Sequence, residues 1–431
     1  MKKNKVKIVY FSPSHWDREW YQPFQEFRFH LVATMRRVLE VLEHDPAFTV
    51  FCFDGQSIVI EDALAAAPEL EARLRRQLEA GRLRIGPWYV QPDEFLVSGE
   101  ALIHNLLAGR AVCRKYGAES WSVGYLCDTF GHIESMPRIL AGFGIGLAAL
   151  WRGAPPELPV YFRWRSADGS EVVVYKMPAK QGYGDFTGAV TDFFDRALPE
   201  AEFVAKAKPY CDARLAELNA PALVLMDGVD HAPIHRAAPA YVGYLQKLYP
   251  DCEVTLGTID DIMPVLESCR AGLPVHCGEL ACSNPEPGGF LNLITHTLSS
   301  HPEQKRRNDQ LQTVLERQIS PLCAAGEEEN RNFLQLAWQY LLQNHAHDSI
   351  CGCSPGRVHL DMEYRFRQVE DIVEALRHDW IARDFARYTG MPIDRTCPPI
   401  SGDAPMPEAD GGDGVLALRI YNSLPYPVDG V

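Results

Sequence analysis

Short apolar segments alternate with amphipathic helical segments from residue 6 to residue 271, and this alternation is the feature that most constrains the fold. Apolar runs at 6–11, 48–53, 83–86, 122–126, 146–150, 171–176, 222–226 and 254–257 predict strands. The segments 30–43, 66–80, 101–116, 135–142, 200–219 and 259–271 have helical spacing. Strands that alternate with helices predict an α/β fold with a parallel sheet, which can stay open or close into a barrel.

The pattern changes near residue 304, where helical segments at 303–322, 330–342 and 358–388 replace the alternation and predict a small helical bundle. Residues 398–414 are rich in Pro, Gly and Asp, as in a linker, and residues 415–431 start like a β-domain. We therefore expect a catalytic α/β domain at 1–298, a helical bundle at 299–390, a linker at 391–414, and at 415–431 the start of a β-domain that the sequence cuts short.

Charge and hydropathy exclude several classes of function. The 431 residues carry a formal net charge of -15, which argues against binding to nucleic acid or to anionic lipid. The basic first residues lack the apolar region of a signal peptide, and no stretch approaches the roughly 18–20 apolar residues that span a membrane. We expect a cytoplasmic protein whose 12 cysteines stay reduced. Cys351 and Cys353 lack the second pair that a zinc site would need, so they are interpreted as packing residues.

Polar residues follow the first predicted strand, and such residues form sites at the carboxyl edge of parallel sheets. His15 and Asp17 are two positions apart on an extended segment, so their side chains point to the same side. A nitrogen and a carboxylate oxygen suit zinc. Such a pair is also common by chance, so it gains weight only from other ligands.

Three further clusters supply such residues. Asp128 follows the strand at 122–126, where it could also cap the next helix. Asp227 and Asp230 follow the strand at 222–226; Asp227 is explained by a turn or could orient Asp230. His347 lies between helical segments, with a second histidine and an aspartate within four positions, which favours a ligand cluster over a solvated histidine.

Together these clusters resemble glycoside hydrolase family 38, the α-mannosidases. The matching segments occur in the family's order up to about residue 380. They are His15-Trp16-Asp17-Arg18-Glu19-Trp20, Gly86-Pro87-Trp88-Tyr89, Tyr125 through Gly131, Phe143-Gly144-Ile145, Leu150-Trp151-Arg152-Gly153 and His347-Asp348-Ser349-Ile350.

The resemblance implies a role for each matching residue. It implies that one zinc ion is held by His15, Asp17, Asp128 and His347, that Asp128 is also the nucleophile, and that Asp230, in a looser match, is the general acid/base. Asp93 and Glu94 are alternatives for that acid. The implied substrate contacts are the aromatic platform Trp20 and the basic Arg152 beside the nucleophile. Asp93 could also bind substrate hydroxyls, Asp348 is a further candidate for substrate binding, and Trp88 could equally be a core residue or a platform for the sugar.

The implied activity is that of a retaining, exo-acting α-mannosidase with a barrel of seven strands. Such an enzyme needs two carboxyl groups about 5–5.5 Å apart and forms a covalent mannosyl-aspartate. The zinc would chelate the 2- and 3-hydroxyls of mannose, so we expect chelators and Asp128→Ala to abolish activity. The natural substrate could be an α-mannoside oligosaccharide or mannosylglycerate.

Two other functions remain open at this point. A zinc-dependent carbohydrate deacetylase can use a similar barrel with Asp and His ligands, and would release acetate. A carbohydrate-binding relic would bind sugar without turnover. Family members also continue into β-domains that complete the cleft and make oligomer contacts, so we expect a homo-oligomer only through parts that this sequence lacks, and weak activity of the chain alone.

Overall fold

A computed structural model describes residues 5–282, 298–324 and 328–389. The predicted linker at 391–414 and the predicted β-domain at 415–431 lie outside these residues. Two compact units divide the chain: one comprises the residues up to 309 together with 341–365, and the other comprises 310–340 and the residues from 366 onward. The domain boundary expected after residue 298 stays a prediction.

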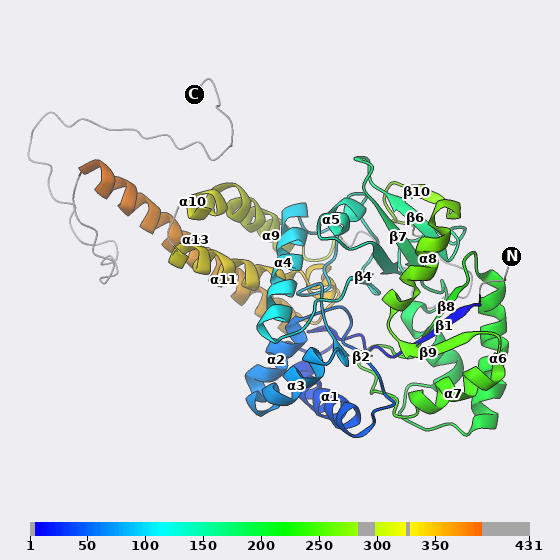
Figure 1. The fold of residues 1–431 in the computed structure, drawn as a ribbon. Helices are drawn as coiled ribbons and strands as arrows, with labels where there is room; N and C mark the ends of the chain where they lie inside the picture. The colour runs from blue at the N-terminus through cyan, green and yellow to red at the C-terminus, as the bar shows by residue number, and fades with distance from the viewer. Residues whose placement is uncertain (1–4, 283–297, 325–327, 390–431) are drawn as a thin grey trace, which may run out of the picture. The chain divides into compact units, whose positions relative to one another are not determined.

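Each apolar run predicted as a strand forms one (Figure 1). The corresponding strands are β1 (Lys7–Phe11), β2 (Phe51–Cys52), β3 (Leu83–Arg84), β4 (Val123–Leu126), β5 (Leu147–Leu150), β7 (Glu171–Lys176), β8 (Ala222–Met226) and β9 (Glu253–Gly257). Two strands were not predicted: β6 (Tyr161–Arg165), which pairs antiparallel with β7, and β10 (Val275–Cys277).

The strands of the described residues form three sheets with the orders β8-β1-β9, β10-β6-β7-β5-β4 and β2-β3. All strand pairs except β6–β7 are parallel. This confirms the predicted α/β fold with parallel sheets. A single closed barrel of seven strands is not confirmed by these pairings.

Two hydrophobic cores lie on opposite faces of the strands. Alternate residues of five strands share the inner core: Val9, Phe11, Val123, Tyr125, Leu147, Ala149, Val173, Tyr175, Ala222 and Val224. Their neighbours, such as Leu126, Ala148 and Val174, pack instead against Leu102 and Leu140 of the covering helices. Burial on both faces explains why these strands are nearly continuous apolar runs.

Helices follow most of the strands in sequence. They are α1 (Phe24–His44), α2 (Ile58–Ala66), α3 (Glu71–Glu79), α4 (Gly99–Lys115), α5 (Met136–Gly142), α6 (Glu200–Glu217), α7 (Ala238–Leu248) and α8 (Met263–Cys269). The helix α7, which packs on α6 and on β9, was not predicted.

The rest of the described chain is helical. Its helices are α9 (Pro302–Val314), α10 (Ser320–Ala324), α11 (Glu328–Asn344), α12 (His347–Ile350) and α13 (Gly356–Thr389). Within the second unit, Asn330 donates to Asp379 (Nδ2–Oδ2 2.9 Å), but a bundle as such is not confirmed. In the part of the chain that is described, no helix is both long enough and apolar enough to cross a membrane.

Candidate active site

The loop after β1 is fixed from both sides. The backbone N–H of Ser14 donates to the carbonyl of Cys52 (3.1 Å), which joins the loop to β2. On the other side, the N–H of His231 donates to the carbonyl of His15 (2.8 Å), which joins it to the loop after β8. The carboxyl ends of β1 and β8 therefore present His15 and Asp230 side by side, in a parallel backbone bridge.

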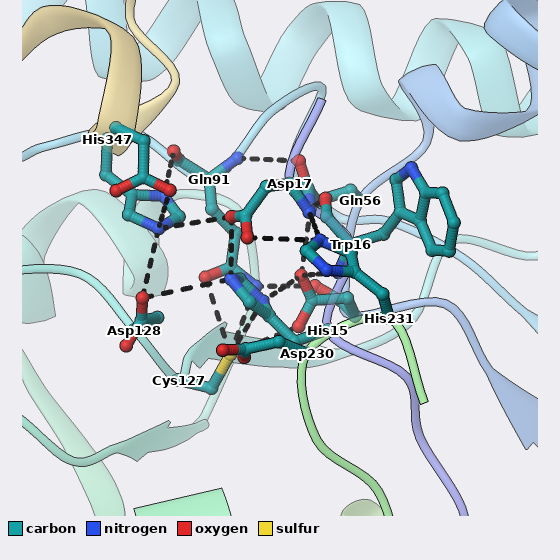
Figure 2. Close-up of polar contacts among 12 residues, drawn as sticks. His15, Trp16, Asp17, Gln56, Gln91, Cys127, Asp128, Asp230, His231 and His347 are labelled. Atoms are coloured by element: carbon teal, nitrogen blue, oxygen red, sulfur yellow. Dashed lines mark hydrogen bonds and ion pairs between the residues drawn. The ribbon is translucent and has the colours of Figure 1, made fainter. Parts of the chain in front are cut away.

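Four predicted ligands converge on one point. His15 Nε2 lies 3.0 Å from Asp17 Oδ1 and 3.9 Å from Asp128 Oδ2. His347 Nε2 lies 3.3 Å from Asp128 Oδ2 and 3.6 Å from Asp17 Oδ1. All four side chains are buried, and Figure 2 shows them turned toward a common centre. The structure thus brings together residues that are more than 300 positions apart in the sequence.

The donor atoms fit a metal ion. Among the described residues, His15 Nε2 and Asp17 Oδ1 are buried without a hydrogen-bond partner, although they are 3.0 Å apart. Together with His347 they form a cluster whose ligand atoms lie within 4.8 Å of one another. Burial lowers the pKa of His347, but the carboxylates of Asp348 and Asp128 raise it to about 10 on balance. Nitrogen and oxygen donors with such excess negative charge suit a divalent cation, zinc in particular.

A second layer of side chains orients both imidazoles. Asp54 Oδ2 lies 2.6 Å from His15 Nδ1, and Gln56 donates to the same oxygen (Nε2–Oδ2 2.8 Å). The carbonyl of Gln91 lies 3.3 Å from His347 Nδ1. Because each Nδ1 faces an acceptor, each Nε2 is the nitrogen that faces the common centre, and it can bind a metal ion that displaces its proton.

Arg152 holds one oxygen of Asp128. Its Nε and Nη2 donate to Asp128 Oδ1 at 2.8 and 2.6 Å, so that Oδ2 is the atom that faces His15 and His347. Burial would raise the pKa of Asp128, but the positive charges of Arg152 and His347 outweigh it and hold this pKa well below the usual range of an aspartate. Asp128 is therefore ionised at neutral pH.

Asp230 has the opposite electrostatic character. Burial and the nearby charges of Asp128 and Asp17 raise its pKa, against the opposing effect of His15. Tyr183 donates to Asp230 Oδ1 (2.5 Å). A carboxyl with a raised pKa beside an ionised one is the arrangement of an acid and a nucleophile in one site. Asp227 is engaged elsewhere: it accepts hydrogen bonds from the hydroxyls of Tyr10 and Thr191 at 2.5 and 2.6 Å.

His347 reaches the site through the helical segment that belongs to the first unit. Its N–H donates to the carbonyl of Gln91 (3.0 Å). Ser349 donates to Glu19 Oε1 (2.7 Å), and Arg365 pairs with both oxygens of Glu19. The buried Glu19 thus ties the segment around His347 to the loop that carries His15.

The predicted substrate residues lie in different surroundings. Asp93 is buried, and burial raises its pKa, on balance to about 7. Its N–H donates to the carbonyl of His345 (3.2 Å), two residues before His347. Asp348 Oδ2 lies 3.6 Å from His347 Nε2. The half-buried Trp20 ring packs on Tyr21 (centroids 5.1 Å apart). Trp88 is fully buried in the outer core with Leu102 and Leu106, a position that favours packing over a sugar contact.

Several residues of the site were missed or undervalued in the sequence. Asp54 looks like a turn residue because Gly55 follows it, and Tyr183 lies in a segment without periodicity. His231, which follows Asp230 in the sequence, lies 3.2 Å from Asp17 Oδ2 through its Nε2. Glu94, an alternative acid, is occupied by His132 (Oε1–Nδ1 2.6 Å) and by the N–H of Ile133. Only the histidine beside Asp230 carried a recognisable signal.

Comparisons with known proteins identify relatives of the chain. A family profile described as "Glycosyl hydrolases family 38 N-terminal domain" matches residues 5–222, and one described as "Alpha mannosidase middle domain" matches 292–383. A solved α-mannosidase from Enterococcus faecalis superimposes with a TM-score of 0.79 and 30% identity, covering 89% of this chain and 43% of that chain.

Curated proteins show the same relationship. The chain is 34% identical over 379 residues to a protein of Halalkalibacterium halodurans named "Putative mannosylglycerate hydrolase", covering 83% of this chain and 40% of that protein. It is 24% identical to human Alpha-mannosidase 2C1 over 78% of this chain and 31% of the human protein. The chain spans about two fifths of the length of the first of these relatives. Both domain profiles, in the order expected along the chain, show that it belongs to glycoside hydrolase family 38.

Proposed function

We propose that the chain is the catalytic part of a retaining, exo-acting α-mannosidase. The observation that carries this proposal is the presence of two buried carboxyls of opposite electrostatic character in one site: Arg152 binds Asp128 Oδ1 and lowers the pKa of that carboxyl, whereas burial raises the pKa of Asp230. A retaining glycosidase needs this pair, one group to attack and one to protonate.

The metal proposed for this site is a zinc ion held by His15, Asp17, Asp128 and His347. When bound, it would chelate neighbouring hydroxyls of the sugar and stabilise negative charge on them. The orphaned atoms His15 Nε2 and Asp17 Oδ1 support this assignment. The orientation of each imidazole through its Nδ1 supports it independently.

The proposed reaction has two steps on the side chains of this site. Asp128 attacks the anomeric carbon and forms an ester, while the bond to the leaving group breaks and its oxygen takes the proton of Asp230. A water molecule then attacks the anomeric carbon and gives a proton to Asp230, while the bond from that carbon to Asp128 breaks, which restores both carboxyls. Two inversions leave the anomeric configuration unchanged. Arg152 would stay paired with Asp128 Oδ1 and keep this carboxyl in place during both steps.

The remaining polar residues would bind the sugar. Asp93 and Asp348 are buried carboxyls beside His347, suited to accept hydrogen bonds from hydroxyls. Tyr21 is exposed, its hydroxyl lies 3.3 Å from His231 Nδ1, and its ring meets the Trp20 ring edge to face (interplanar angle 72°). The Trp20–Tyr21 pair is therefore the aromatic surface that we assign to the substrate.

Mannosylglycerate is the second candidate substrate. The observation that favours it is the 34% identity to the protein of Halalkalibacterium halodurans whose name specifies that substrate. The two candidates use the same reaction and differ only in the leaving group, so they make the same demands on Asp128 and Asp230.

We also infer that seven strands form a distorted barrel in the order β8-β1-β2-β3-β4-β5-β7, in which β9 pairs with β1 along Lys7–Phe11 and β2 follows on the same edge beyond Phe11, at Ser12 and Ser14. Hydrogen bonds between β1 and β2 at Ser14–Cys52, and between the ends of β3 and β4 at Trp121–Ile85, support the links between sheets. The shared inner core of alternate residues supports closure. The seam lies between β7 and β8, where Tyr175 and Val224 line a cavity of about 460 Å³.

The test is an assay of the zinc-supplemented chain on linkage-defined α-mannobioses and on mannosylglycerate, with proton NMR of the first product. We expect α-mannose to appear first, and chelation to stop the reaction until zinc is restored. Because the chain spans about two fifths of the length of its relative, calorimetry with a cationic mannose-shaped inhibitor provides a second readout that needs no turnover. Initial release of β-mannose, release of acetate from an acetylated sugar, or full activity after chelation would overturn the proposal.

A further inference from the structure

Two thiols lie beside the candidate active site and have no part in the proposed reaction. Cys351 and Cys353 follow α12 and are separated by Gly352, whose φ of +85° lets the chain turn back. Both thiols are free, Cys351 is buried, and Cys353 is exposed. Each sulfur lies 3.7 Å from the carbonyl oxygen of Asp348, and Cys353 Sγ lies 3.3 Å from Asp348 Oδ1.

The Asp348 carboxyl lacks strong compensation for its charge. It is 5% exposed, and its partners among the described residues are the Cys353 thiol at Oδ1 and the His347 imidazole, 3.6 Å from Oδ2. A thiol is a weak donor. A buried carboxylate with such weak partners gains stability from a cation on its open side.

We propose that Asp348, Cys351 and Cys353 form a second, thiophilic metal site that takes zinc or a softer divalent ion such as cadmium. The two sulfurs and one carboxylate oxygen lie within 4.8 Å of one another. Tetrahedral zinc with bonds of about 2.3 Å to sulfur spaces two sulfurs by about 3.8 Å, so closure moves these atoms by about 1 Å at most. Because Cys353 is exposed, a water molecule can take the fourth coordination position of the ion.

The chemistry of the donors distinguishes this site from the first. Thiolates select soft ions, whereas the imidazole and carboxylate set of His15, Asp17 and His347 suits zinc without favouring softer ions. Binding releases one proton from each thiol, because the thiolate is the ligand. Lys305 is the basic residue nearest the loop, and it donates to the carbonyl of Cys351 (Nζ–O 3.0 Å) rather than to a sulfur.

Occupation of this site has a consequence for the first one. Asp348 lies between the two, with Oδ1 toward Cys353 and Oδ2 toward His347. An ion on the sulfurs would draw Asp348 toward them and away from the sugar hydroxyl that we assign to it. We therefore expect thiophilic ions to inhibit the enzyme without displacing its zinc.

The experiment titrates the zinc-saturated chain with cadmium and follows the sulfur-to-cadmium charge-transfer absorption in the ultraviolet, together with proton release. The unaltered chain should bind one cadmium per chain with two protons released. Cys353→Ser keeps the shape of an exposed side chain and should weaken this binding at least tenfold. Cys277→Ser removes another exposed thiol, and should change nothing.

A second variant distinguishes the loss of a metal ligand from misfolding of the loop. Asp348→Asn should weaken cadmium binding while both thiols still react with a thiol reagent, which shows that the loop is intact. Unchanged titrations in Cys353→Ser and in Asp348→Asn, or a loss in Cys277→Ser, would overturn the proposal. Because the readout is binding, it is independent of whether the chain hydrolyses mannosides.

Discussion

At the scale of single residues, the proposed metal centre depends on how its two histidines are oriented. His15 is held by the charged acceptor Asp54, at 2.6 Å, and His347 by the backbone carbonyl of Gln91, at 3.3 Å. Gln91 also donates to the carbonyl of Asp54 (Nε2–O 2.7 Å). One network therefore fixes both rings, and its strongest contact is the one made by Asp54.

Replacing Asp54 tests this network. Asp54→Ala removes the acceptor for His15 Nδ1, and we expect zinc affinity to fall about 10–100-fold, the usual cost of losing such a partner. Asp54→Asn keeps an acceptor oxygen without the negative charge, so its zinc affinity should lie between that of Asp54→Ala and that of the unaltered chain. Competition with a metal chelator measures both variants, and Asp251→Asn, at an exposed position, is the matched control. Equal zinc affinity in Asp54→Ala and the unaltered chain would contradict the role given to Asp54.

The pH profile of catalysis tests the two carboxyls. Burial raises the pKa of Asp230, so kcat/KM should fall on the alkaline side as Asp230 loses its proton. Arg152 lowers the pKa of Asp128, so the acid limb should lie below the ordinary range of aspartate. Asp230→Ala should lose the alkaline limb while keeping its first step on a dinitrophenyl mannoside, whose leaving group needs no proton. An alkaline limb that persists in Asp230→Ala would assign the acid to another residue, with Asp93 the first candidate.

At the scale of elements, the site depends on the close approach of the turns that follow β1 and β8. A Cβ atom added to Gly228 would lie 1.9 Å from the carbonyl oxygen of Pro13. No side chain fits there, so the turns after the two strands touch through their backbones. This contact sets the spacing between the loop of His15 and the loop of Asp230.

Gly228→Ala should therefore push the two loops apart. We expect a loss of about 1–3 kcal/mol in the free energy of unfolding, the usual cost of overpacking, together with weaker zinc binding because His15 shifts. Gly243→Ala is the control: Gly243 lies in α7 with nothing near its Cβ position, and alanine there should stabilise by about 0.4–1 kcal/mol. Urea unfolding measures the change in the free energy of unfolding of each variant. A neutral Gly228→Ala would mean that the loops are not in backbone contact.

At the scale of the whole molecule, the proposed metal ligands come from distant parts of the sequence of one compact unit. His15 lies near the start of this unit, and His347 lies in its last segment, 341–365. No short segment contains the set, so the unfolded chain cannot form the site. Metal binding must then stabilise the folded unit by mass action.

Thermal unfolding measures this coupling. Zinc at a thousandfold excess over its Kd should stabilise the chain by about 4 kcal/mol and raise Tm accordingly. Asp17→Asn removes an anionic ligand and should lose most of the increase, whereas Cys277→Ser, outside the site, should keep it. An equal increase in Tm for Asp17→Asn and the unaltered chain would place the zinc elsewhere.

Most of the strands, and the residues of the proposed metal centre, could be picked out from the sequence, and the layer behind them could not. The apolar run Ala222–Met226 specifies a buried strand by itself, and resemblance to a family assigns His15 and His347. Asp54 takes its role from a left-handed backbone (φ +51°) that puts its carboxylate under a ring 39 positions away. Tyr183 and the antiparallel β6 likewise depend on contacts across the fold, which periodicity does not report.

The most direct test of the central claim is to identify the residue that carries the sugar. A fluorinated mannosyl fluoride forms the ester quickly and hydrolyses it slowly, so the labelled chain can be digested and its peptides sequenced by mass spectrometry. The account predicts one mannosyl label, on Asp128, formed only when zinc is present and absent in Asp128→Ala. A label on Asp93, Asp230 or any other carboxyl, or turnover with no labelled peptide, would contradict it.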